Sequence, residues 1–382
     1  MKITTLNDLH EVAPDAWNAL VGEASPFLEW AWLASLEEAG CVGRGSGWRP
    51  QHLALWDDYG RLAGACPLYV KEHSQGEFVF DHGWAQAAAR AGIRYYPKLV
   101  VASPFTPATG VRFLARSDID RARVVRVLGT ALRDLCADGG YSSVHVNFCV
   151  PEEAAVLADL GYLRRTGYQF QWSNPGWRTF DDYLAALRSK RRNQVRREQR
   201  ELVASDVVLS TYVGEAIPDE LFAPMFDLYR STVEKFAWGH QYLNARLFGL
   251  LRRRWKHRLA FVIARRRGRI LAGAFNVWKG ALLYGRYWGA FEDVRHLHFN
   301  VCYYAAIELA LALGARRFEP GAGGEFKHLR GFDACPTTSM HFLGDARLAD
   351  AVRRYLVEER RAVGREIDWL DSRTALRRGD QA

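Results

Sequence analysis

The chain has 382 residues, of which 49% are hydrophobic and 13% aromatic, which excludes a disordered protein and favours two folded domains, because single cores rarely grow beyond about 250–300 residues. The formal net charge is +9, and a surplus of five positive charges lies between Arg188 and Glu201 alone, so the sequence predicts a local anionic partner rather than a DNA-coating protein. No apolar run reaches the ~18 residues that span a bilayer, and neither a secretory signal nor a close cysteine pair is visible, so we expect a cytoplasmic protein without a transmembrane segment, disulfide frame or metal site.

An internal repeat organises the chain. The segment HLALWDDYGRLAGACPLYVK, from His52 to Lys71, closely matches LAFVIARRRGRILAGAFNVWKG, from Leu259 to Gly280. Each copy reads as two strands joined at a Gly-Arg turn, with two helices before it and a helix and a strand after it. The expected helices are Pro14 to Val21, Phe27 to Ala39 and Ile119 to Ala137 in the first half, and Asp219 to Phe236, Asn244 to Arg254 and His298 to Leu313 in the second.

Strands that are joined first by hairpins and later by a helical crossover form a mixed sheet with helices on both faces. The sequence therefore predicts an α/β (α+β) fold in which each half has a mixed, partly antiparallel sheet flanked by helices. We expect residues 1–173 to form the first domain and residues 174–382 the second.

The first half carries an extra segment at about residues 77–110, rich in aromatic residues and ending in the proline-marked run SPFTPATG. Segments of this kind often line binding clefts. A surface excursion with its own small apolar cluster is the alternative. If the segment lines a cleft, its candidate substrate-binding residues are Tyr96, Lys98, Ser103 and Thr106.

At the junction, YLRRTGYQFQWSN reads as the closing strand of the first domain, and FDDYLAAL begins a helix that continues into the basic run SKRRNQVRREQR. On one continuous helix Arg191 shares a face with Leu184 and Val195, so it should be less exposed than Arg192 or Arg200. A buried guanidinium needs an anion, either a ligand or an internal acid. The candidate ligand contacts on this helix are Arg191, Arg192 and Arg196.

The second half concentrates aromatic and charged residues around one apolar helix. The strand LLYGRYWGAF precedes this helix, and the glycine-rich run GAGGEFKHLRG follows it after a short strand. A hairpin with solvated charges is the simpler interpretation of the glycine run. In the expected topology, however, this run passes over the helix N-terminus, where Arg286, His298, Glu325 and Lys327 should line one pocket that favours an anionic group.

Several motifs together resemble the FemAB-like branch of the GNAT acyltransferase superfamily, also described as predicted N-acyltransferases or peptidoglycan biosynthesis/recognition proteins. They are RYYPKL and SPFTPATG in the first half, QFQWSN and SKRRNQVRREQR at the junction, and LYGRYWG, LHFNVCYY and FEPGAGGEFKHLRGF in the second half. The resemblance covers nearly the whole chain. It implies two tandem GNAT-like domains and transfer of an acyl or aminoacyl group to an amine, on a cell-wall precursor or a related anionic or peptide-linked metabolite.

Amide formation needs a base for the proton of the amine and hydrogen-bond donors at the carbonyl oxygen. Glu325 is the first candidate for the base and His298 the second. The second half also supplies candidate substrate-binding residues, namely Arg286, Tyr287, Trp288, Asn300, Lys327, His328 and Arg330. A Tyr-Trp pair in the core and a solvated glutamate are the structural alternatives for these positions.

The sequence departs from the family pattern in ways that leave the donor open. An acid is usual where Asn300 stands, and a histidine where Phe326 stands. The turn that holds coenzyme A in acetyl-CoA-dependent members is replaced by AFEDVRHLHFN, and the long helical hairpin of the tRNA-dependent Fem enzymes is missing. Acyl-CoA and aminoacyl-tRNA both remain candidate donors, with no tightly bound cofactor expected. A non-catalytic protein of the same fold that binds a muropeptide or tRNA is the alternative, and the oligomeric state stays open.

Overall fold

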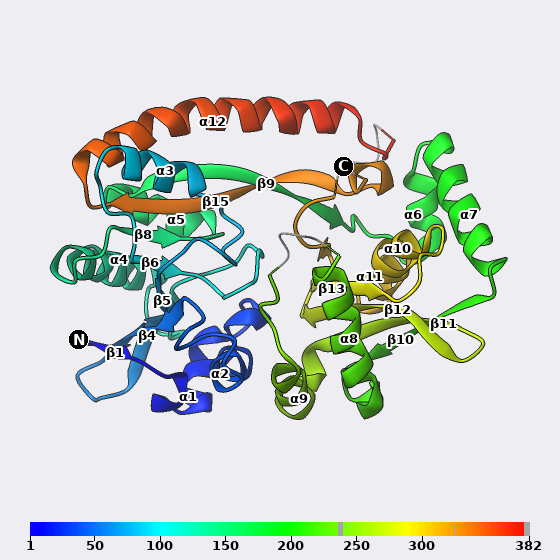
Figure 1. Ribbon diagram of the computed structural model, residues 1–382, viewed down its shortest axis with the longest axis horizontal. Helices are drawn as coiled ribbons and strands as arrows, with labels where there is room; N and C mark the ends of the chain where they lie inside the picture. The colour runs from blue at the N-terminus through cyan, green and yellow to red at the C-terminus, as the bar shows by residue number, and fades with distance from the viewer. Residues whose placement is uncertain (236–239, 325, 378–382) are drawn as a thin grey trace. The chain divides into compact units, whose positions relative to one another are not determined.

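The computed structural model describes residues 1–235, 240–324 and 326–377 (Figure 1). The chain forms two compact units. The first comprises Met1–Gly167 and Pro336–Arg365, and the second comprises Tyr168–Cys335 and the residues from Glu366 onward. These bounds differ from the expected division at residue 173, because the strands β9 (Leu163–Ser173) and β15 (Asp333–Leu343) each begin in one unit and end in the other.

The first unit holds two sets of strands. One is a four-stranded sheet in the order β1 (Lys2–Leu6), β3 (His52–Trp56), β4 (Leu62–Cys66) and β7 (Leu114–Ala115). The other runs in the order β15, β8 (Ser143–Val146), β6 (Lys98–Val101), β5 (Leu68–Lys71) and β2 (Trp48–Pro50). The helices of this unit are α1 (Pro14–Val21), α2 (Trp30–Glu38), α3 (His82–Arg90), α4 (Arg121–Asp138) and α5 (Pro151–Asp159).

The strands of the second unit follow one order: β10 (Val207–Val213), β11 (Leu259–Arg266), β12 (Arg269–Lys279), β13 (Leu282–Ala290), β14 (Arg317–Glu319) and β9. Its helices are α6 (Phe180–Ala186), α7 (Ser189–Val203), α8 (Phe222–Val233), α9 (Ala245–Arg254), α10 (Leu297–Phe299) and α11 (Ala305–Ala312). The long helix α12 (Ala346–Ser372) starts in the first unit and ends in the second. In the first unit, Leu348 and Val352 of α12 pack against Trp84 of α3.

Both copies of the repeat form antiparallel hairpins, β3–β4 and β11–β12, as predicted. In each unit the next strand also pairs antiparallel, and the one after it pairs parallel following a helix: β5–β6 and β6–β8 across α4, then β12–β13 and β13–β14 across α10 and α11. The predicted mixed sheets flanked by helices are therefore confirmed. The copies differ at Pro67, which separates β4 from β5, whereas β12 is continuous.

The segment at about residues 77–110 is not wholly an insertion. Its residues Lys98–Val101 form β6, which lies between β5 and β8 and is completely buried. Four consecutive buried residues are typical of a strand that is covered on both faces. The additional part of the segment is α3 with its connecting loops, and the side chains of Trp84 and Tyr95 belong to the apolar cluster that includes α12.

The helix predicted to run from Phe180 through the basic segment is broken. α6 ends at Ala186, Leu187 and Arg188 are extended, and α7 begins at Ser189. A distant segment causes the break: Arg188 N–H donates to the Ala375 carbonyl (2.9 Å), and Arg377 N–H donates to the Ala186 carbonyl (3.0 Å). Helical periodicity cannot be carried across this break, so the predicted alignment of Arg191 with Leu184 is wrong.

Among the described residues, no helix combines the length and the apolar character that crossing a membrane requires. The six cysteines carry free thiols, and those at positions 41, 66, 136 and 149 are buried.

Candidate active site

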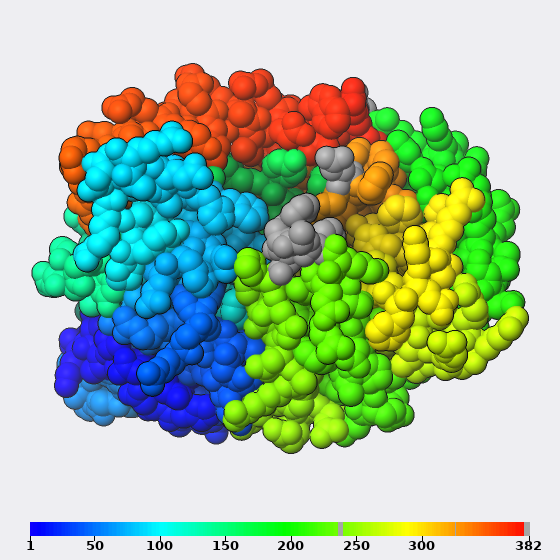
Figure 2. Space-filling view, viewed as in Figure 1, coloured from blue at the N-terminus to red at the C-terminus, as the bar shows by residue number. Residues whose placement is uncertain are grey.

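The strand β13 is shaped by a bulge and by one glycine. In its pairing with β12, Tyr287 lies opposite Phe275 and Gly285 lies opposite Asn276, so the register shifts by one residue at Arg286. A bulge of this kind redirects a side chain and is common beside binding sites. At Gly289 a Cβ atom would come within 1.7 Å of the Leu228 carbonyl oxygen, so the glycine permits the close contact between β13 and α8. In Figure 2 yellow residues of the second unit lie on the surface beside its green residues.

The apolar helix predicted for His298 to Leu313 exists and spans α10 to α11, with a π-helical stretch at Asn300–Tyr304 between them. π-Helical turns shift the helix register and recur at functional sites. Here His298, Cys302 and Tyr303 line a cavity, whereas Asn300 and Tyr304 bond to Glu198 of α7. This helix therefore contributes side chains both to the cavity and to the separate polar group around Glu198.

That cavity has a volume of about 220 Å³ and is referred to below as the first cavity. The strand β13, the helix and the glycine run all contribute to it. The cavity therefore brings together Arg286 and Lys327, which are 41 positions apart in the sequence. The predicted residues Arg286, Tyr287, Trp288, His298 and Lys327 all line it. Its other described lining residues are Ala274, Gly285, Cys302, Tyr303, Pro320, Gly321, Ala322, Gly323 and Gly324.

The charges in the first cavity suit an anionic or electron-rich group. Lys327 is buried and donates a hydrogen bond from Nζ to the Gly321 carbonyl (2.6 Å), and burial lowers the pKa of this amine to about 8. Arg286 supplies a second cation. No carboxylate lies among the described residues that line the cavity. A ligand oxygen that carries negative charge would therefore meet two cationic groups in a partly desolvated setting.

His298 lies against the ring of Trp288, with the ring centroids 4.6 Å apart. Burial, and then the positive charges of Lys327 and Arg330, lower the pKa of His298 to about 4. The imidazole is therefore neutral at pH 7 and can exchange hydrogen bonds with a ligand. It is a weak base there, because proton transfer is most efficient when the pKa of the base lies near the working pH. Glu325, the first candidate for the base, lies outside the described residues.

Arg330 and Asn300 belong to a separate, closed cluster and do not line the first cavity. Arg330 is 1% exposed and forms a buried ion pair with Glu198, with Nη2 2.9 Å from Oε2. Its Nε donates to Tyr304 Oη (2.9 Å), and its guanidinium lies 3.5 Å from the ring centroid of Phe299. Tyr304 also donates its hydroxyl to Glu198. The cation predicted to hold substrate is thus engaged in joining α7 to the core of its unit.

The hydrogen bonds of Asn300 give a physical reason for one departure from the family pattern, an asparagine where an acid is usual. Its amide nitrogen donates to the backbone carbonyls of His296 (2.9 Å) and Glu198 (3.2 Å). A carboxylate has no proton to donate, so an ionised acid could not make these two bonds. At the second departure, the Phe326 side chain is 58% exposed, and its carbonyl oxygen accepts a hydrogen bond from Arg330 (3.1 Å).

Glu198 is a buried charge that we did not predict, although the sequence contains a signal for it. Val195, Glu198 and Leu202 are spaced three and four apart, so they share one helix face, and all three are buried. On the same helix Arg191 and Arg192 are both half-buried, and Arg196 and Arg200 are exposed. Arg191 Nη1 donates to Gln194 Oε1 (3.0 Å). The prediction that Arg191 alone points inward is therefore wrong: the buried charge on α7 is Glu198.

Of the four candidates in the first unit, Lys98, Ser103 and Thr106 are buried and Tyr96 is half-buried. Lys98 is completely buried and donates to Ser74 (3.0 Å), to Glu77 (3.0 Å) and to Asp81. Tyr96 shares a hydrogen bond with Ser74 (2.7 Å). Ser103 accepts one from the Trp32 indole (3.2 Å), and Thr106 donates one to the Pro104 carbonyl (2.9 Å). Every one of these polar side chains already has a protein partner, which suits a structural role.

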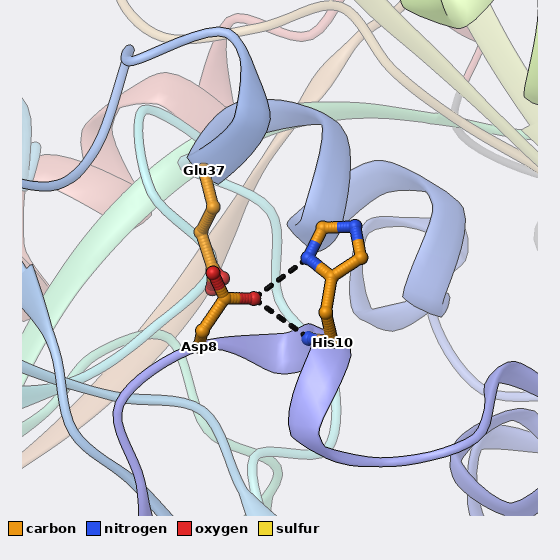
Figure 3. A group of neighbouring side chains, drawn as sticks. All are labelled: Asp8, His10 and Glu37. Atoms are coloured by element: carbon orange, nitrogen blue, oxygen red, sulfur yellow. Dashed lines mark hydrogen bonds and ion pairs between the residues drawn. The ribbon is translucent and has the colours of Figure 1, made fainter.

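One group of side chains in the first unit could offer metal ligands: Asp8, His10 and Glu37 (Figure 3). Each already makes a structural contact. Asp8 accepts from the His10 backbone N–H (2.7 Å) and lies 2.6 Å from its ring Nδ1, and Glu37 accepts from Leu9 N–H (2.8 Å) and pairs with the buried His52 (2.8 Å). These contacts account for the cluster as a cap that joins a short 3-10 helix to α2.

Comparison with solved structures identifies the fold. FemX is 11% identical, with 92% of this chain and 100% of that chain covered and a TM-score of 0.56. L-PGS from Bacillus licheniformis is 11% identical, with 90% and 96% covered and a TM-score of 0.54. A conserved protein of unknown function from Bacteroides thetaiotaomicron VPI-5482 is 12% identical, with 90% and 100% covered and a TM-score of 0.53. These likenesses show a shared fold.

A comparison with curated proteins gives no significant sequence match. The family model FemAB_like, described as peptidoglycan biosynthesis/recognition, matches residues 8–378. The predicted resemblance to the FemAB-like family is thereby confirmed, and the predicted mixed α/β fold is one that FemX shares. This protein belongs to the FemAB-like family.

Proposed function

We infer that this FemAB-like protein is an acyltransferase that transfers an acyl or aminoacyl group to an amine, with the first cavity as its reaction site. The observation that carries the proposal is the cavity itself, where Arg286 and Lys327 face a neutral His298 and the aromatic wall of Tyr287 and Trp288. The acceptor class that fits the family is a cell-wall precursor or a related anionic, peptide-linked metabolite.

The cavity offers what acyl transfer needs at the carbonyl group. As the amine attacks, negative charge develops on the carbonyl oxygen, and Lys327 and Arg286 would stabilise it. Removing one such donor typically costs about 10²–10³ in rate. His298, being neutral, would orient a reactant through a hydrogen bond. The base remains Glu325 in this proposal, on the sequence alone.

The test is amide formation, measured by mass spectrometry, with acetyl-CoA, longer acyl-CoAs and aminoacyl-tRNA as donors and amine-bearing muropeptides as acceptors. With the productive pair, Lys327→Met should reduce kcat/KM about 10²–10³-fold, and Glu325→Gln about 10²–10⁴-fold, without loss of folding. Binding of the substrates without any product would favour the alternative, a non-catalytic binding protein. Unchanged activity of Glu325→Gln would remove Glu325 from the mechanism.

The basic helix α7 bears on the choice of donor. Its exposed cations Lys190, Arg196, Arg197 and Arg200 form a positive surface that would favour the phosphate backbone of a tRNA. If aminoacyl-tRNA is the donor, replacing Arg196 and Arg200 by alanine should lower tRNA affinity and reduce the slope of log affinity against log salt by roughly 2, about one per phosphate contact. An unchanged slope would exclude this surface as the tRNA contact.

A further inference from the structure

A second cavity of about 520 Å³ lies in the same unit as the first cavity. It is formed by the final part of β9, the glycine run, the residue that follows Lys327, and the last turns of α12. Its described lining residues are Tyr168, Gln169, Phe170, Gly323, Gly324, His328, Glu366, Trp369 and Leu370.

The two cavities meet at the glycine run. Among their described lining residues they share Gly323 and Gly324 only. The backbone φ angles of these two residues are +70° and +92°, which only glycine adopts readily. Further along the chain, two adjacent residues line different cavities: Lys327 lines the first cavity and His328 lines the second. The backbone of these two glycines is therefore the border that the two cavities share.

The second cavity has aromatic walls and an unused polar atom. Tyr168 and Phe170 meet edge to face at 5.9 Å, and the imidazole of His328 stacks on Phe170 at 6.3 Å. Nδ1 of His328 is shielded from solvent and has no hydrogen-bond partner in the described part of the chain. An imidazole nitrogen in this state can accept a hydrogen bond from a ligand.

The charges of the two cavities are opposite. Apart from His328, the charged side chain among the described lining residues of the second cavity is Glu366, and no lysine or arginine lies among them. One face of the Trp369 ring is already occupied by a cation, since the guanidinium of Arg373 lies 4.1 Å from the ring centroid. Aromatic faces beside a carboxylate are a setting that favours an ammonium group.

We propose that the second cavity receives the acceptor as a primary alkylammonium group, held by Glu366, by the aromatic walls and by Nδ1 of His328. The assignment rests on the proposed function, in which the carbonyl group of the donor occupies the first cavity. The alkylammonium first loses a proton to the base; the neutral amine then attacks the carbonyl carbon at the border formed by Gly323 and Gly324, and the thiol or hydroxyl group of the donor leaves. Glu366 is exposed and cation–π contacts are individually modest, so the isolated group should bind in the millimolar range.

The test measures binding without turnover, so it stands apart from the assay of the proposed function. Saturation-transfer NMR would follow n-pentylamine, with 1-pentanol and pentanoate as neutral and anionic probes of similar length. We expect the amine to bind at least about fivefold more tightly than the alcohol, and pentanoate to bind more weakly than both. Equal binding of the amine and the alcohol would overturn the proposal.

Variants locate the site. Glu366→Gln should weaken n-pentylamine binding about threefold, and Trp369→Leu should weaken it by a similar factor. Asp368→Asn removes the same charge from an exposed position of α12 that does not line the cavity, and should leave binding unchanged. Lys327→Met should not weaken amine binding. Equal effects of Glu366→Gln and Asp368→Asn, or loss of binding in Lys327→Met, would refute the proposed site. Amine binding as expected, with no amide formed from any donor, would refute the proposed function instead.

Discussion

The strands β6 and β13 occupy corresponding places in the two units, because each pairs antiparallel with the second strand of the repeat and parallel with the strand after the crossover. Each carries a cation. In the first unit, Lys98 of β6 is enclosed by Glu77 and Asp81. In the second unit, Arg286 of β13 lies at a bulge and lines a cavity together with Lys327. Internal carboxylates therefore surround the cation of the first unit, whereas the cation of the second unit lines a cavity.

The pKa shifts of two buried lysines, one in each unit, also distinguish the two units. Burial opposes the charge of Lys98, but Glu77 and Asp81 outweigh it and raise the pKa of the amine. Lys327 has no carboxylate among the described residues of its cavity, and burial lowers its pKa to about 8. Among the described residues, Lys327 thus keeps a charge that an anionic ligand can meet, whereas the charge of Lys98 is matched by two carboxylates within the fold. We therefore assign the chemistry to the second unit.

The largest expected effect comes from breaking the closed cluster of the first unit. Lys98→Met would leave Glu77 and Asp81, which are 4% and 1% exposed, without their cation. Removing one partner of a buried ion pair typically costs about 3–5 kcal/mol of the free energy of unfolding. Urea denaturation would measure the loss. A change below about 1 kcal/mol would mean that the cluster does not hold this unit together.

The second largest effect concerns the closed cluster of the second unit. Arg330→Met would leave Glu198 buried, with its hydrogen bonds from Tyr304 and Gln194 still in place. Because these bonds partly compensate the charge, we expect a loss of about 3 kcal/mol in the free energy of unfolding. Arg200→Met, an exposed change on α7, is the control and should cost less than about 0.5 kcal/mol. Equal losses in the two variants would contradict a structural role for Arg330.

A third, smaller effect depends on pH. The pKa of His298 is about 4 in the folded protein, below the unfolded value of roughly 6.5. Between these values the unfolded chain binds more protons, so the contribution of His298 to stability falls as the pH falls from about 6.5 to 4. His298→Gln should remove this loss. Relative to the unaltered protein, the free energy of unfolding of this variant should therefore be on the order of 2 kcal/mol larger at pH 4 than it is at pH 7. His82→Gln, an exposed change on α3, is the control, and its free energy of unfolding plotted against pH should run parallel to that of the unaltered protein. Parallel curves for His298→Gln would mean that His298 is not held neutral by the fold.

Local patterns predicted much of this architecture. The Gly-Arg hairpins and the apolar helix after the YGRYWG strand were predicted because their signals lie within a few consecutive residues. The break between α6 and α7 was missed, since it depends on Ala375 and Arg377, which lie almost 190 positions away. No short sequence pattern records such a contact.

The same distinction holds for the site. Arg286, His298 and Lys327 were predicted to meet because strand, helix and glycine run follow one another in the chain. The buried ion pairs of Arg330 and Lys98 were not predicted, because the sequence does not say which carboxylate lies beside a buried cation. Glu198 reaches Arg330 across 132 positions. Only the packing of α7 against the core reveals that pair.

The most direct test of the account is thermal unfolding of the protein with and without candidate donors, because a ligand that binds the native state raises its stability. We predict that one donor class, acyl-CoA or aminoacyl-tRNA, raises the Tm of the unaltered protein and of Lys2→Met, a surface change of the same charge in the first unit, by several degrees. Lys327→Met should fold with a Tm within a few degrees of the unaltered protein and show no such rise. An equal rise in Lys327→Met would contradict the claim that the first cavity binds the donor.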